Sequence, residues 1–132
     1  RGLHYQLQPF HQSKLVMCIS GEIFDVAVDL RRNSRTFGNW VGVILNNKNH
    51  NKLWIPEGFG HGYLTLSSAA TVLYKATNLW NKELERSISW DDHKININWP
   101  FEKIQHIKPI LSPKDSSAMT FEDAFIKNEI FI

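Results

Sequence analysis

Residues 22–29 read Glu22-Ile23-Phe24-Asp25-Val26-Ala27-Val28-Asp29, a run of β-branched and aromatic side chains that predicts a strand. Because side chains alternate between the faces of a strand, the two faces differ. Phe24, Val26 and Val28 lie on one face, and Asp25, Ala27 and Asp29 lie on the other. A carboxylate in mid-strand needs a partner if it is buried. The stretch therefore predicts a strand that carries a titratable group, Asp25, on one face.

Similar runs recur along the chain, separated by turn-forming residues. The predicted strands cover residues 3–6, 14–20, 22–30, 40–45, 52–55, 62–67, 71–77 and 86–90, where 22–30 is the stretch quoted above with Leu30 added. Eight short strands of this kind are typical of a small antiparallel jelly roll. Residues 112–125 differ, because Ser112 and Pro113 begin a pattern that predicts one terminal helix. We expect an all-β jelly-roll barrel of antiparallel strands with a short C-terminal helix.

The composition is that of one globular domain. A length of 132 residues fits a single domain, and 42% hydrophobic against 21% charged residues supports a packed core. No linker or repeat divides the sequence, so we predict one domain over residues 1–132. The net charge of +2 comes from scattered residues, which gives little support for binding to nucleic acid or to an anionic membrane.

The cellular location is predicted from what the sequence lacks. Cys18 is the only cysteine, so an intrachain disulfide is impossible, as suits a reducing cytoplasm. No apolar run approaches the roughly 18–20 residues of a membrane span. We therefore expect a soluble cytoplasmic protein. Arg1 leads directly into a strand pattern without an initiator Met, so we also expect that an N-terminal segment is missing.

Alternation places one titratable or hydrogen-bonding side chain on a face of each of five strands: His4, Lys14, Asp25, His61 and Tyr74. Taken singly, a strand His or Tyr is usually a packing residue, and a strand Lys usually protects an exposed edge. Their joint occurrence favours a site. If the five faces converge inside one barrel, they form a pocket suited to acid–base chemistry.

Other chemistries have weaker support. The sequence has no His-x-His ligand pair, and His11, His50, His93 and His106 stand in polar, turn-like stretches that favour the surface, so we predict no metal and no cofactor. Cys18 has no neighbouring His, and no Gly-x-Ser-x-Gly motif or phosphate-binding glycine loop occurs. Trp80, in the polar stretch 78–81, is expected to be exposed and able to stack on a ligand.

Several motifs occur in the order and spacing of one family. They are RGLHYQ at 1–6, GEIFDVAVD at 21–29, TFG at 36–38, LWIPEGF at 53–59, HG at 61–62, LYK at 73–75 and LSPKD at 111–115. Over nearly its whole length the chain resembles the dTDP-4-dehydrorhamnose 3,5-epimerases. The resemblance implies a cupin-type jelly roll that works as a homodimer without a metal. It also implies a role in making dTDP-L-rhamnose for cell-surface polysaccharide. The family's N-terminal portion is absent from this sequence.

The resemblance also implies roles for individual residues. His4 matches the general base and Asp115 its carboxylate partner, while Tyr74 matches a proton donor on the other face of the sugar. Lys14 and His61 match groups near the keto oxygen, and Asp25 matches a residue that orients His61. The matching substrate-binding positions are Arg1, Lys14, His61, Trp80, Glu85 and Lys114. Trp80 stands where Tyr is common and is expected to stack on thymine.

These roles agree with elementary chemistry. A proton next to a ketone can be removed only if a base accepts it and donors stabilise the developing oxyanion. Inversion also requires a second acid on the opposite face, which Tyr74 supplies. The predicted reaction converts dTDP-4-dehydro-6-deoxy-D-glucose into dTDP-4-dehydro-L-rhamnose. Two alternatives remain: an epimerase that inverts one centre only, and a jelly roll that binds the sugar nucleotide without catalysis.

Overall fold

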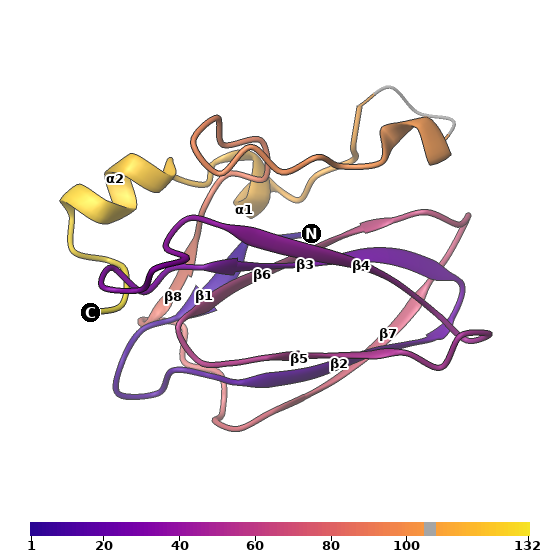
Figure 1. The fold of residues 1–132 in the computed structure, drawn as a ribbon, viewed down its shortest axis with the longest axis horizontal. Helices are drawn as coiled ribbons and strands as arrows, with labels where there is room; N and C mark the ends of the chain where they lie inside the picture. The colour runs from indigo at the N-terminus through magenta and orange to yellow at the C-terminus, as the bar shows by residue number, and fades with distance from the viewer. Residues whose placement is uncertain (105–107) are drawn as a thin grey trace.

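The computed structural model describes residues 1–104 and 108–132, and in these residues eight strands form two antiparallel sheets. The strands are β1 (His4–Gln6), β2 (Lys14–Ser20), β3 (Glu22–Asp29), β4 (Trp40–Asn46), β5 (Lys52–Ile55), β6 (Phe59–Thr65), β7 (Thr71–Ala76) and β8 (Glu85–Ser87). The large sheet has the order β4-β3-β6-β1-β8, and the small sheet has the order β5-β2-β7. Figure 1 shows the two sheets stacked as layers. The predicted all-β jelly roll of antiparallel strands is confirmed.

The alternation predicted for β3 is also confirmed. Ile23 and Ala27 face the small sheet and contribute to an inner core with Val16 and Ile55. Val26 and Val28 face away from the small sheet and contribute to a second, outer core. Asp25 lies on the inner side and is fully buried. Strand β3 is therefore covered on both faces, with its carboxylate between the sheets.

The outer core is covered by the C-terminal part of the chain, which crosses the large sheet in Figure 1. This segment contains η1 (Phe101–Lys103), α1 (Pro113–Ser116) and α2 (Phe121–Ile126). Large side chains from it, among them Trp99, Phe121 and Phe131, pack against Val26, Val28 and Leu30. In the described residues, no helix has the length and apolar character to cross a membrane.

The prediction of one helix over residues 112–125 was wrong, since two short helices occupy this region. Ser112 caps α1 by accepting a hydrogen bond from the backbone N–H of Asp115. The chain then leaves the helix because Met119 forms a bridge with Ile88, and the N–H of Ser89 donates to the carbonyl of Met119. Thr120 caps α2 in the same way that Ser112 caps α1. This tertiary pairing divides the predicted helix.

The largest differences between predicted and observed strand boundaries are at β6 and β8. Strand β6 begins at Phe59, three residues before the predicted start at 62, and includes Gly60 and Gly62. A Cβ on Gly62 would lie 2.8 Å from the carbonyl oxygen of Arg1 and 3.0 Å from Leu3, so glycine lets the chain at β1 approach β6 closely. Strand β8 ends at Ser87 instead of residue 90.

Leu30→Ala tests whether the outer core stabilises the fold. Leu30 is 0% exposed, so its truncation should lower the free energy of unfolding by about 2–5 kcal/mol. Leu79→Ala is the matched control, because Leu79 is 89% exposed and the same truncation should change stability by less than about 0.5 kcal/mol. Chemical denaturation of both variants measures the difference, and equal losses would contradict the assignment of Leu30 to a packed core.

Candidate active site

Two histidines lie side by side on the inner face of the large sheet. His4 of β1 and His61 of β6 are directly opposed in the antiparallel register. Nε2 of His4 lies 2.5 Å from Oδ1 of Asp115, and Nε2 of His61 lies 2.7 Å from Oδ1 of Asp25. All four side chains are buried. The pKa of Asp115 is lowered, and because an ionised carboxylate only accepts hydrogen bonds, Nε2 of His4 carries the proton of this pair and Nδ1 remains the basic nitrogen.

Burial sets the protonation of both imidazoles. It lowers the pKa of His4 below its ordinary value of 6.5, against the hydrogen bond and charge of Asp115, which raise it. Burial likewise lowers the pKa of His61, against the opposing effect of Asp25. Burial raises the pKa of Asp115, but the hydrogen bond and charge of His4 outweigh it, so this pKa is lowered. The histidines are therefore neutral at neutral pH, while Asp115 is ionised.

The small sheet contributes Lys14 and Tyr74 from the opposite side. Lys14 begins β2, and Tyr74 of β7 is paired with Val16, so both side chains share the inner face with Val16. Burial, followed by the charge of Arg1, lowers the pKa of Lys14 to about 8, although the charges of Glu85 and Asp25 raise it. Tyr74 is 50% exposed. The predicted site residues thus come from both layers.

The remaining predicted residues form a rim beside His4. Lys114 is the second residue of α1, and its Nζ lies 2.6 Å from Oε1 of Glu85 on β8. Burial raises the pKa of Glu85, but hydrogen bonds from Lys114 and then from Trp80 outweigh it and lower the pKa. Trp80 is 64% exposed, as predicted. Arg1 accepts a backbone hydrogen bond from Tyr63 at 2.8 Å, which fixes the entry to β1.

Two polar residues of this region were missed from the sequence. Tyr63 shares the inner face of β6 with His61, and the centroids of their rings are 6.2 Å apart. Burial raises the pKa of Tyr63, with smaller effects from nearby charges that include Asp25. The alternation that groups Tyr63 with His61 is a signal that could have found it. Gln6, on the same face as His4, is also buried.

Three further histidines of the described residues, His11, His50 and His93, take no part in the pairs of His4 and His61. Nε2 of His11 lies 2.7 Å from Oε2 of Glu57, and His50 and His93 are exposed. His106 lies outside the described residues. In residues 1–104 and 108–132, no three His, Cys, Asp or Glu side chains are grouped as metal ligands would be.

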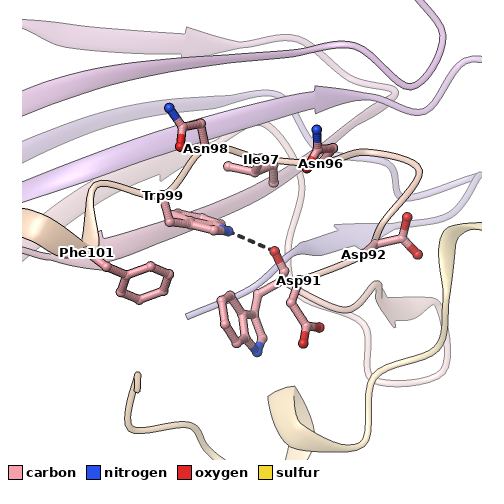
Figure 2. Close-up of a pocket in the computed structure, with 8 residues that line it drawn as sticks. Asp91, Asp92, Asn96, Ile97, Asn98, Trp99 and Phe101 are labelled. Carbon is pink, nitrogen blue, oxygen red and sulfur yellow. Dashed lines mark hydrogen bonds between the residues drawn. The ribbon is translucent and has the colours of Figure 1, made fainter. Parts of the chain in front are cut away.

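Two surface cavities lie near the fold's C-terminal segment. One of about 230 Å³ is lined by residues of the segment after β8, including Asp92, Asn96 and Phe101, and contains none of the predicted site residues (Figure 2). The dashed line there marks the hydrogen bond that Trp99 Nε1 donates to the carbonyl of Trp90 at 2.8 Å. A larger cavity of about 680 Å³ is lined by Arg1 and Tyr63 and therefore borders the site.

Residues 1–123 match the family model described as dTDP-4-dehydrorhamnose 3,5-epimerase. The chain belongs to this family. It is 53% identical over 124 residues to the dTDP-4-dehydrorhamnose 3,5-epimerase of Shigella flexneri, a match that covers 94% of this chain and 66% of that relative. The chain thus spans slightly less than two thirds of that relative's length. Family membership supports the cupin-like jelly roll expected from the sequence.

Solved structures of epimerases in the family share the fold closely. The Legionella pneumophila enzyme in complex with dTDP-4-keto-L-rhamnose superposes with a TM-score of 0.90 and 44% identity, covering 99% of this chain and 66% of that one. A 3'-monoepimerase from Streptomyces bikiniensis in complex with dTDP-quinovose has a TM-score of 0.89 and 32% identity, covering 98% of this chain and 64% of that one. The family fold therefore serves both kinds of epimerase.

The electrostatic description of His4 predicts two substitutions with opposite effects on its pKa. Asp115→Asn removes the negative charge that raises the pKa, so the titration midpoint of His4 should fall further below 6.5. Lys114→Met removes a positive charge that lowers the pKa, so the midpoint should rise. Side-chain NMR titration of His4 measures both. Shifts in the same direction would contradict the account.

Proposed function

We propose that this chain is an isomerase that inverts C3 and C5 of dTDP-4-dehydro-6-deoxy-D-glucose to give dTDP-4-dehydro-L-rhamnose, without a metal or cofactor. The observation that carries the proposal is the buried His4–Asp115 pair on the large sheet, with Tyr74 on the facing small sheet. A sugar ring between the sheets would then have a base on one side and a phenol on the other. Family membership supports the same reaction.

The first step removes a proton from a carbon next to the C4 ketone. Nδ1 of neutral His4 takes the proton, and the electron pair of the C–H bond moves into an enolate whose negative charge lies on the C4 oxygen. Asp115 stabilises the resulting imidazolium. Lys14, still protonated below about pH 8, and His61 are the donors that we place at this oxygen, with Asp25 orienting His61.

The second step returns a proton to the opposite face of the same carbon. The hydroxyl of Tyr74 donates it, the enolate becomes the ketone again, and the configuration is inverted. Proton exchange with solvent restores neutral His4 and Tyr74. Because the same ketone activates both neighbouring carbons, the cycle can run at C5 and at C3. At the rim, Arg1, Glu85 and Lys114 would bind the nucleotide sugar, and Trp80 would stack on thymine.

The likeness to the Streptomyces 3'-monoepimerase favours a second candidate, an epimerase that inverts one centre only. A base such as His4 and an acid such as Tyr74 serve either reaction, so the two candidates differ in which carbons exchange protons. A binding protein without catalysis is less well supported, because every acid–base position of the site is occupied. Proton NMR in deuterated water separates the three: deuterium enters C3 and C5, one of them, or neither.

His4→Asn tests the base. Removal of a general base should slow deuterium incorporation by at least about 10²–10⁴-fold while the fold persists. His50→Asn is the matched control, because His50 is exposed and lies in the connection between β4 and β5, and the rate of deuterium incorporation in this variant should be unchanged. Tyr74→Phe should retain more exchange than net inversion. Normal exchange in His4→Asn, or equal losses of exchange and inversion in Tyr74→Phe, would refute the assignment.

We also propose that the chain forms a homodimer and works in the cytoplasm. The outer face of the small sheet supports a dimer, because Trp54, opposite Leu15, and Leu73, opposite Met17, are large exposed apolar residues. The lone thiol, Cys18, is compatible with a reducing compartment.

Trp54→Lys tests this face. A charge in the centre of a dimer contact costs binding energy, so the variant should sediment as a monomer at concentrations where the parent chain is a dimer. Ile126→Lys, a change at an apolar residue on α2 that is even more exposed than Trp54, should leave the dimer intact. Analytical ultracentrifugation distinguishes the outcomes, and a dimeric Trp54→Lys chain would exclude this face as the contact.

A further inference from the structure

Gln6 is a buried polar residue that the steps above leave without a role. It lies two positions after His4 on β1, so both side chains share the inner face of the large sheet. A buried amide must satisfy its donors and its acceptor within the protein. Gln6 does so with backbone groups of two connections between strands.

Its amide binds the peptide groups on both sides of Trp80. Oε1 of Gln6 accepts a hydrogen bond from the N–H of Asn81 at 2.8 Å, and Nε2 donates to the carbonyl of Leu79 at 3.0 Å. Nε2 also donates to the carbonyl of Phe10 in the β1–β2 connection. The backbone around Trp80 is thus fixed to the strand that carries His4, while its indole is largely exposed.

The indole lies near the residue opposite Gln6. Gln6 and Glu85 are directly paired between β1 and β8, Trp80 helps to lower the pKa of Glu85, and Lys114 forms an ion pair with Glu85. Gln6 therefore holds the backbone at Trp80 beside the carboxylate that the indole approaches. The same Glu85 contacts the residue next to Asp115, the partner of His4.

We propose that Gln6 is a positioning residue for the base of a pyrimidine nucleoside diphosphate sugar, acting by holding the two peptide groups that flank Trp80. The proposal rests on the proposed function, in which Trp80 stacks on thymine. Gln6 does not touch the reacting carbons. It sets the distance and tilt of the indole relative to His4, and so aligns the nucleotide end of the substrate with the catalytic end.

The test is a double-mutant cycle on the full chain, with dTDP binding measured by calorimetry. Gln6→Met keeps the length of the side chain and removes its hydrogen bonds, so dTDP affinity should fall roughly tenfold. Trp80→Ala should cause a similar loss, and the double variant should bind no more weakly than Trp80→Ala alone, since both changes remove one stacking contact. In Gln6→Met, the rate of deuterium exchange at saturating substrate should stay within about threefold of the parent rate, and KM should be raised.

Gln12→Met is the matched control. Nε2 of Gln12 donates to the carbonyl of Asn78 in the same connection, but this bond does not flank Trp80, so dTDP affinity should be unchanged. If Gln6→Met fails to fold, Gln6→Glu replaces it: the carboxylate still accepts from Asn81 and loses both donated bonds, and dTDP affinity should fall by several-fold.

The outcomes separate the two proposals. Parent-like dTDP affinity in the folded Gln6 variant, multiplied losses in the double variant, or no effect of Trp80→Ala would overturn the role of Gln6. An equal loss in Gln12→Met would also overturn it, since any anchor of the connection would then serve. A parent chain that binds dTDP but incorporates no deuterium would refute the epimerase function instead, and the binding cycle would still decide the role of Gln6.

Discussion

Strand β3 is buried on both faces, so the large sheet requires one covering layer on each side. On the inner side the small sheet covers Ile23 and Ala27, and on the outer side the C-terminal segment covers Val26 and Val28. Each valine fully buried in this way contributes on the order of 1.5–3 kcal/mol. Because the outer layer is built from residues after β8, its path across the sheet brings α1 beside β1 and the edge strand β8. The segment that covers the outer face of the large sheet thus also supplies Asp115, the partner of His4 on the inner face.

The inner face combines burial with charge in a way that suits enolate chemistry. Asp25 and Asp115 are buried carboxylates, and each is stabilised by a histidine because an isolated buried charge would be costly. Burial keeps both imidazoles neutral, so one can accept a proton at neutral pH. Positive charge comes from Arg1 and Lys114, which lower the pKa of His4 further, and from Lys14, which lowers the pKa of His61 further. The basic nitrogen of His4 thus lies among positive charges that would stabilise the enolate anion.

Local patterns predicted much of this arrangement, because strand period and turn residues are local properties. They placed the strands, separated the faces of β3 and put His4 and His61 on strand faces. They could not show that Asp115, 111 residues from His4, would be its partner, and only the family motif indicated it. The break between α1 and α2 depends on the pairing of Met119 with Ile88, and the early start of β6 depends on close contact at Gly62. Such long-range contacts have no signature in the neighbouring sequence.

The most direct test of the account is the position of the hexose in a crystal structure of the chain with dTDP-4-keto-L-rhamnose. We expect the ring between the two sheets, with His4 facing one side of it, Tyr74 facing the other, and the C4 oxygen within hydrogen-bond distance of Lys14 and His61. A hexose with His4 and Tyr74 on the same side, or one bound outside the space between the sheets, would contradict the account.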